Sequence, residues 1–269
     1  MPLKLAAVAT VQPTTFEAVA SRENLEQNVR LIRDLGYDGV ELAVRDPSQV
    51  DADAIASLVS DCGLVVPAIG TGQAYIEEGM SFADPDPEIR RSAVDRIKQH
   101  VELAERFGAL VIIGLIRGTC EKREEQGETL KRVGDCLLEC TSYGSEHGVT
   151  LVLEPLNRYE TSLLNNFRQT IDFLDEISAD NVGILADSFH MNIEEPSITE
   201  SLRCGASRIG HVHVADSNRQ APGRGHIDFS EFCDTLTSIG YNGFYSAEIL
   251  PVPDGNSAIA DAISFLRSL

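Results

Sequence analysis

The sequence contains no tryptophan, and its 22 lysine and arginine residues are outnumbered by 42 aspartate and glutamate residues, which gives a formal net charge of -20. Proteins that bind nucleic acid or an anionic membrane through charge carry a basic surface, which this composition does not favour. No apolar run approaches the ~20 residues of a membrane span. We therefore expect no nucleic-acid partner and no membrane partner.

Six cysteines are present, but none forms a Cys-x-x-Cys pair. Cys136 and Cys140 are four residues apart, which is the spacing of one helix face. Scattered, reduced core cysteines are the simplest interpretation, and they favour a cytoplasmic location.

The sequence also lacks the glycine signatures of nucleotide-binding loops. No Gly-x-Gly-x-x-Gly fingerprint follows the first apolar segment, where an open nucleotide-binding sheet would carry it. The glycine-bearing stretches Gly70–Tyr75 and Pro222–His226 lack the Gly-Lys-Ser/Thr ending of a phosphate loop. We expect both to be loops. They are either tight turns without a further function, or, for the first, a loop in which Tyr75 contacts the substrate.

What the sequence does contain is a regular alternation of short apolar segments and amphipathic helices. The expected strands are Leu3–Val8, Gly39–Val44, Leu64–Ile69, Ala109–Ile116, Val149–Glu154, Val182–Asp187, Ile209–Ala215 and Gly243–Ile249. The expected helices lie at about 24–36, 55–63, 87–107, 130–145, from 166 onward, 198–204, 228–240 and 258–269. Asn166 and Asp228 are the expected caps of two of these helices.

Parallel strands joined by right-handed crossovers form either an open sheet or a closed barrel. Eight strand-helix units within 269 residues fit the closed form. The sequence therefore predicts an α/β fold, a single (β/α)8 TIM barrel, as one domain over residues 1–269.

Several expected strands end on a polar residue. These residues are Glu41, Glu154, Asp187, His213 and Glu248. In a barrel the carboxyl ends of the strands meet at one mouth, where the chemistry takes place. The last four residues come from consecutive strands, and three carboxylates with an imidazole repel one another unless a cation lies among them. Such oxygen-rich ligands suit Mn²⁺, Mg²⁺ or Co²⁺, so we predict a metal site formed by Glu154, Asp187, His213 and Glu248.

His211 precedes His213 by two residues, so it points the same way one layer deeper in the barrel. We expect a core or supporting histidine rather than a ligand.

A second set of polar residues follows the predicted ligands. Glu160, His190 and Arg219 fall in expected strand-to-helix loops, where substrate contacts are common in barrels. Solvated loop charges are the alternative interpretation. Arg117, just after the fourth strand, is a further candidate contact for an anionic group.

Three stretches resemble the ketose 3-epimerases, the D-tagatose and D-psicose 3-epimerase group of the xylose isomerase-like barrels. They read Glu-Pro-Leu-Asn-Arg-Tyr-Glu-Thr at 154–161, Asp-Ser-Phe-His-Met-Asn-Ile-Glu-Glu at 187–195 and His-Val-Ala-Asp-Ser-Asn-Arg-x-x-Pro-Gly at 213–223. The resemblance spans nearly the whole chain. Residues 68–75 and 111–118 look more similar to the 5-keto-L-gluconate epimerases, a subgroup that acts on keto-sugar acids.

The resemblance implies an isomerase that inverts the carbon next to the carbonyl of a small keto-sugar or keto-sugar acid. It implies one divalent metal ion, with Mn²⁺ favoured and Co²⁺ or Mg²⁺ as alternatives, on the four predicted ligands. Glu154 and Glu248 would also be the catalytic pair, exchanging a proton on opposite faces of the sugar through an enediolate. Glu160, His190 and Arg219 would hold substrate oxygens. The oligomeric state is left open, with a homodimer or homotetramer as candidates.

Other activities would use the same metal site. An aldose-ketose or hydroxypyruvate-type isomerase moves the proton between adjacent carbons, and an inosose-type dehydratase expels a hydroxyl group. A zinc endonuclease would need more metal ligands and a basic face, which the charge of -20 disfavours. A sugar-sensing barrel without activity would require a broken site, whereas every residue of the matched set is present.

Overall fold

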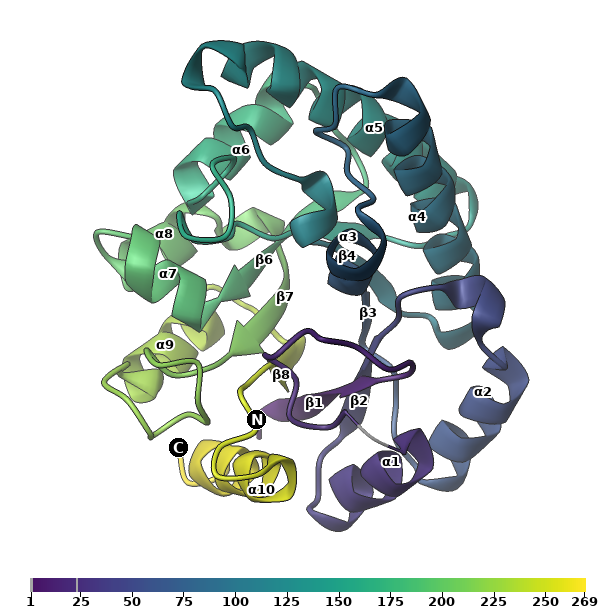
Figure 1. The fold of residues 1–269 in the computed structure, drawn as a ribbon. Coiled ribbons are helices and arrows are strands. Elements are labelled where there is room, and N and C mark those ends of the chain that lie inside the picture. Colours follow the sequence, from purple (N-terminus) through teal and green to yellow (C-terminus); the bar gives the residue numbers. More distant parts are fainter. Residues whose placement is uncertain (1, 23) are drawn as a thin grey trace.

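The computed structural model of the protein describes residues 2–22 and 24–269. Within these residues, parallel strands β1 to β8 close into a barrel in sequence order, and the helices form a ring around it (Figure 1). The strands are β1 Lys4–Thr10, β2 Gly39–Ala43, β3 Ala68–Gly70, β4 Leu110–Ile113, β5 Leu151–Leu153, β6 Val182–Asp187, β7 Ile209–Val214 and β8 Phe244–Ala247. The predicted (β/α)8 fold is confirmed.

The α-helices are α1 Leu25–Asp34, α2 Ala52–Asp61, α3 Gly72–Glu78, α4 Pro87–Phe107, α5 Gln126–Glu146, α6 Phe167–Glu176, α7 Ser188–Glu194, α8 Ile198–Cys204, α9 Phe229–Ser238 and α10 Gly255–Leu266. Short 3₁₀ turns occur at Pro47–Gln49, Leu115–Arg117, Arg123–Glu125 and Ala206–Arg208. Among the described residues, no helix has the length and apolar character that crossing a membrane requires.

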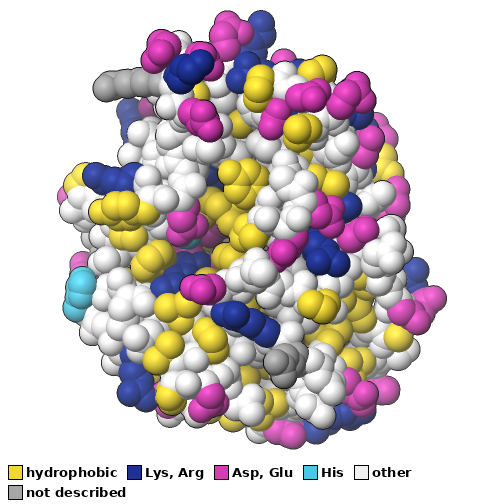
Figure 2. Space-filling view, in the orientation of Figure 1, with side chains coloured by type: hydrophobic (Ala, Val, Ile, Leu, Met, Phe, Trp, Pro, Cys, Tyr) yellow, Lys and Arg dark blue, Asp and Glu magenta, His cyan; other side chains and the backbone are white. Residues whose placement is uncertain are grey.

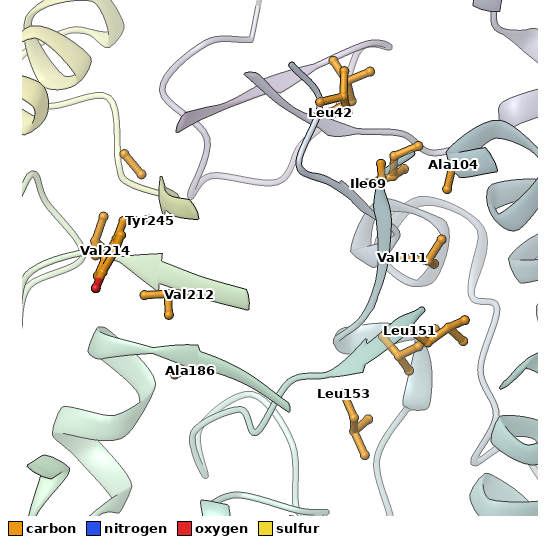
Figure 3. Close-up of a cluster of buried hydrophobic side chains, with 14 of the residues drawn as sticks. Leu42, Ile69, Ala104, Val111, Leu151, Leu153, Ala186, Val212, Val214 and Tyr245 are labelled. Atoms are coloured by element: carbon orange, nitrogen blue, oxygen red, sulfur yellow. The ribbon is translucent and has the colours of Figure 1, made fainter. Parts of the chain in front are cut away.

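Along each strand, side chains point alternately outward to the helices and inward to the barrel interior, which gives two apolar layers. Outward-facing side chains pack against the helices in one large cluster, and Figure 3 shows members of it such as Ile69, Val111 and Leu151. The residues between them face the barrel interior and form a second, smaller cluster of Ala68, Ile112, Val152 and Leu185. The same alternation continues to the strand ends, so it decides which residues there point into the barrel mouth.

Capping residues fix where several helices begin. The Asn166 side chain accepts a hydrogen bond from the Gln169 amide at 2.9 Å, and Asp228 accepts one from the Glu231 amide at 2.9 Å. Both were predicted as caps, and each satisfies an amide that has no partner within its helix.

The third and fourth strands are shorter than predicted. Strand β3 begins only after Pro67, because proline has no amide hydrogen for the sheet, and Val65 makes just an isolated bridge to Gly39. Strand β4 ends at Ile113, and the chain turns at once into the 3₁₀ turn Leu115–Arg117. The predicted strand over Ala109–Ile116 is therefore wrong at its first residue and in its last three residues.

Two short helices were predicted as loops. Helix α3 occupies most of the glycine-bearing stretch Gly70–Tyr75, and α7 follows β6 without a connecting loop. His190 therefore lies on a helix, whereas Glu160 and Arg219 lie in loops as predicted. Each helix has only seven residues, about two turns, which is too short for a clear 3.6-residue periodicity.

Replacing the cap of α9 tests this description of the fold. The Asp228→Ala variant should lose about 1 kcal/mol of unfolding free energy, because the Glu231 amide loses its acceptor. Asp228→Asn keeps the acceptor and should stay close to the parent protein. Urea unfolding of both variants measures the difference, and equal destabilisation by the two would show that the cap is not the cause.

Candidate active site

Four polar side chains from consecutive strands meet at the mouth of the barrel. Asp187 is the last residue of β6, and His213 lies beside it in register on β7. Glu154 and Glu248 directly follow β5 and β8. Because these positions continue the inward-facing rows of their strands, all four side chains point towards the barrel axis.

The geometry of this cluster fits a metal ion. One ligand atom from each of the four residues lies within 4.8 Å of the others. His213 Nδ1 is 3.6 Å from Glu154 Oε1, 3.6 Å from Asp187 Oδ2 and 3.5 Å from Glu248 Oε2. Both His213 Nδ1 and Glu154 Oε1 are buried without a hydrogen-bond partner, which is costly unless a ligand satisfies them. Three carboxylates and one imidazole suit a divalent cation.

A buried carboxylate below the cluster orients its histidine. Glu41 on β2 is 2.9 Å from His213 Nε2 and 2.7 Å from His211 Nε2. A carboxylate only accepts hydrogen bonds, so His213 carries a proton on Nε2 and presents Nδ1 to the cluster. Burial opposes ionisation of Glu41, yet the two histidines hold its pKa well below the usual range. His211 is thus a partner of Glu41 and not a member of the four-residue cluster, as predicted.

Arg219 neutralises part of the acidic cluster. Its Nη1 donates to Asp187 Oδ2 at 2.7 Å, its Nη2 donates to Glu248, and its guanidinium lies 4.9 Å from the ring centre of Phe189. The loop that carries it is held by Asp216, whose carboxylate accepts the amides of Gly223 at 2.8 Å and Ile227 at 3.1 Å. The predicted site residue Arg219 is therefore fixed in the mouth.

Asp187 has a second function besides its place in the cluster. Its Oδ1 accepts the amides of Phe189 at 2.8 Å and His190 at 3.2 Å, which caps helix α7. The last residue of β6 therefore sets the direction of α7 and brings the His190 ring to the mouth.

Hydrogen bonds fix the tautomer of His190. Its Nδ1 lies 2.8 Å from the Asn157 side-chain amide and 3.2 Å from the Asn157 backbone amide, both of which donate. Its Nε2, 4.0 Å from Glu154 Oε1, therefore carries the proton. Burial lowers the pKa of His190 to about 3, so the ring is neutral at physiological pH. Asn157 also donates to Glu160 at 2.8 Å, which holds that carboxylate over the site.

A cavity of about 180 Å³ opens above these residues. Figure 2 shows a hollow near the middle of this face, with hydrophobic side chains gathered beside it and acidic side chains within it. Glu41, Glu154, Glu160, His190, His213, Arg219 and Glu248 line the cavity, and Asp187 lies directly behind Arg219. The structure thus brings together the residues predicted to bind the metal ion and the substrate, with the exception of Arg117 and Tyr75.

Arg117 and Tyr75 do not line this cavity. Arg117 is fully buried, and its guanidinium donates to backbone carbonyls of Leu163 at 3.0 Å, Leu164 at 3.3 Å and Glu154. Tyr75 lines a separate surface cavity with Ile76 and residues 119–122. The helical backbone of α3 directs Tyr75 away from the mouth, and the carbonyls occupy the donors of Arg117.

Fold and site together define a class of protein, a (β/α)8 barrel with an acidic and histidine cluster suited to a divalent cation at its mouth. The chain belongs to the xylose isomerase-like TIM barrel family, whose sequence model matches residues 29–269.

Individual relatives carry epimerase names. An L-ribulose 3-epimerase of Mesorhizobium japonicum is 30% identical over 228 residues, which are 84% of this chain and 75% of that protein. A 3-dehydro-D-guloside 4-epimerase of Escherichia coli is 28% identical over 261 residues, 91% of this chain and 95% of that protein. A solved structure of an L-ribulose 3-epimerase matches with a TM-score of 0.82 at 27% identity, covering 98% of this chain and 93% of that one.

The contact between Glu41 and His213 generates a prediction for metal affinity. Glu41→Gln should weaken Mn²⁺ binding by about 10- to 100-fold, because the amide no longer fixes the Nε2 proton of His213. Calorimetric titration of the purified variant measures this. An unchanged affinity in the folded variant would contradict the supporting role of Glu41.

Metal affinity should also depend on pH. Burial, together with Glu248 and Asp187, raises the pKa of Glu154 to about 7 in the metal-free protein. Burial lowers the pKa of His213, but Glu41 and Glu248 more than offset it and hold that pKa well above its usual value. A cation needs both groups deprotonated, so it must displace protons at low pH.

Mn²⁺ affinity is therefore expected to fall by at least about tenfold per unit as the pH drops below about 7. Titrations in buffers of different ionisation enthalpy also count the protons released on binding. An affinity that is constant between about pH 5.5 and 8 would contradict the cluster as the binding site.

Proposed function

We propose that the protein is a divalent-metal-dependent sugar epimerase that inverts the carbon next to the carbonyl of a keto-sugar. The observation that carries the proposal is the cluster of Glu154, Asp187, His213 and Glu248, in which the two glutamates directly follow strands β5 and β8 and so approach the cavity from different sides. Inversion requires a proton to leave one face of a carbon and another to arrive on the opposite face.

The names of the relatives support this reaction class. They include 3-epimerases and a 3-dehydro-sugar 4-epimerase. A 3-dehydro sugar has its carbonyl at C3, so a 4-epimerase inverts the neighbouring carbon. Both kinds of name describe inversion beside a ketone, which is where a C–H proton is acidic enough to be removed.

The four clustered residues would hold the metal ion, for which we favour Mn²⁺ with Co²⁺ and Mg²⁺ as alternatives. When bound, such an ion polarises the carbonyl group and stabilises the negative charge that develops as the neighbouring proton leaves. Glu154 and Glu248 are then the acid and base, one removing the proton and the other returning one.

The remaining polar residues would position the substrate. His190 offers its Nε2 proton to a sugar oxygen because Asn157 occupies Nδ1. Arg219 stabilises developing negative charge next to the cluster, and Glu160 accepts hydrogen bonds from sugar hydroxyls at the rim. The apolar walls exclude water from the reacting carbon. The cytoplasmic location and the homo-oligomeric state stay predictions.

Two related reactions remain alternatives on the same site, proton transfer between adjacent carbons and loss of a hydroxyl group. Product formed in D₂O distinguishes them. An epimerase incorporates deuterium at the inverted carbon beside the ketone, an isomerase at the former carbonyl carbon, and a dehydratase yields a product that has lost water.

Substitution of one glutamate tests the acid-base pair. Glu248→Gln should reduce both epimerisation and exchange of the substrate proton with solvent by about 10²- to 10⁴-fold, because an amide cannot exchange the proton. Turnover and deuterium incorporation at saturating Mn²⁺, followed by NMR, measure the effect.

Glu231→Gln, on the exposed face of α9, is the matched control and should behave as the parent protein. Exchange at the parental rate in Glu248→Gln would rule out Glu248 as the proton-handling residue.

A further inference from the structure

Gln73 is a buried polar residue with no partner in the protein. Only 1% of its surface is exposed, and both its Oε1 and Nε2 lack a hydrogen bond. A buried carboxamide without partners is destabilising, and natural proteins seldom keep one without a function.

Gln73 lies on the wall of the cavity that holds the four-residue cluster. Among the described residues that line it, buried side-chain atoms without partners occur only on Glu154, His213 and Gln73. The first two belong to the cluster. Gln73 therefore marks a second place where the cavity offers unsatisfied hydrogen-bonding groups.

The two places lie on opposite halves of the barrel. Strands β5–β8 carry the four-residue cluster, whereas Gln73 is on α3, just after β3, which stands across the closed barrel from β7 and His213. In Figure 1, α3 lies close to β3 and β4 near the barrel centre. A molecule that spans the cavity thus meets the cluster at one end and Gln73 at the other.

The wall around Gln73 offers little else to a polar group. It is formed mainly by Val8, Phe16, Ala18, Ala43, Ile112 and Leu115. Thr71 is also there, but its hydroxyl donates to the Ile112 carbonyl at 2.6 Å. Glu41 is bound to two histidines. Within the described lining of this half, Gln73 is the polar side chain left for a ligand.

The chemistry of the carboxamide indicates what it binds. It presents donors and an acceptor but no charge, which suits a hydroxyl group that both donates and accepts. Among the described residues that line the cavity, the one lysine or arginine is Arg219, which lies at the cluster end and is paired with Asp187 and Glu248. A carboxylate or phosphate at this end would meet no free cation.

We infer that Gln73 determines specificity by hydrogen bonding to the uncharged terminal hydroxyl of the substrate, at the end farthest from the reacting carbon. The inference rests on the proposed function for the orientation of the sugar. It assigns the substrate as a neutral keto-sugar, in contrast to the keto-sugar acids that the resemblance of residues 68–75 implies.

Gln73→Met tests the inference, because methionine has a similar length and shape but no hydrogen-bonding amide. The Mn²⁺-loaded parent and variant are titrated by calorimetry with a ketohexose and with its 6-deoxy analogue, and epimerisation of both sugars is followed in parallel. The variant should bind the ketohexose at least about tenfold more weakly and the 6-deoxy sugar nearly as the parent does. Gln49→Met, at an exposed position, is the matched control.

Thermal unfolding of the sugar-free proteins gives an independent result. Since Gln73 has no partner to lose, Gln73→Met should keep or raise the melting temperature while it weakens ketohexose binding. A lower melting temperature with equal losses for both sugars would overturn the inference in favour of a structural role.

Two further outcomes overturn it: unchanged ketohexose binding in Gln73→Met, and tighter binding of a keto-sugar acid than of the ketohexose by the parent protein. Binding without turnover in the parent would refute the proposed epimerase function but leave the assignment of Gln73 standing. The two conclusions can therefore fail separately.

Discussion

The repulsion between three carboxylates that converge at the mouth of the barrel is the constraint on which the rest of the site depends. Glu154, Asp187 and Glu248 converge within a few ångströms of one imidazole, and burial of Glu154 and Asp187 limits how far water can screen their charges. Arg219 pairs with two of them and offsets one negative charge, and Glu41 orients the histidine from below. The mouth of the barrel is thus built around negative charge, and a divalent cation is the simplest group to balance it.

Much of this arrangement follows from the sequence. The alternation of eight strand-helix units predicts the barrel, and the strand ends predict the cluster, because inward-facing residues of neighbouring parallel strands must meet. Glu160 and Arg219 could be placed in mouth loops for the same reason. His211 was correctly separated from the cluster, since it lies one layer below His213.

The features that the sequence did not predict depend on three-dimensional contacts. Helices α3 and α7 are too short for periodicity to reveal. Asn157 is part of a recognisable motif, yet its bond to His190 joins segments 33 residues apart. Arg117 resembled an anion contact, but backbone carbonyls that close around it in the fold use its donors. For Gln73, the decisive property is the absence of a partner, which only a structure can reveal.

Because Asp187 both belongs to the cluster and caps α7, the choice of substitution at this position decides what a mutant can show. One oxygen faces the cluster while the other caps α7, so replacement by alanine removes both a charge and the cap of the helix that carries His190. Loss of activity in that variant would be ambiguous between two causes. Asparagine retains the cap and removes only the charge. At this position asparagine, rather than alanine, therefore isolates the effect of the lost charge.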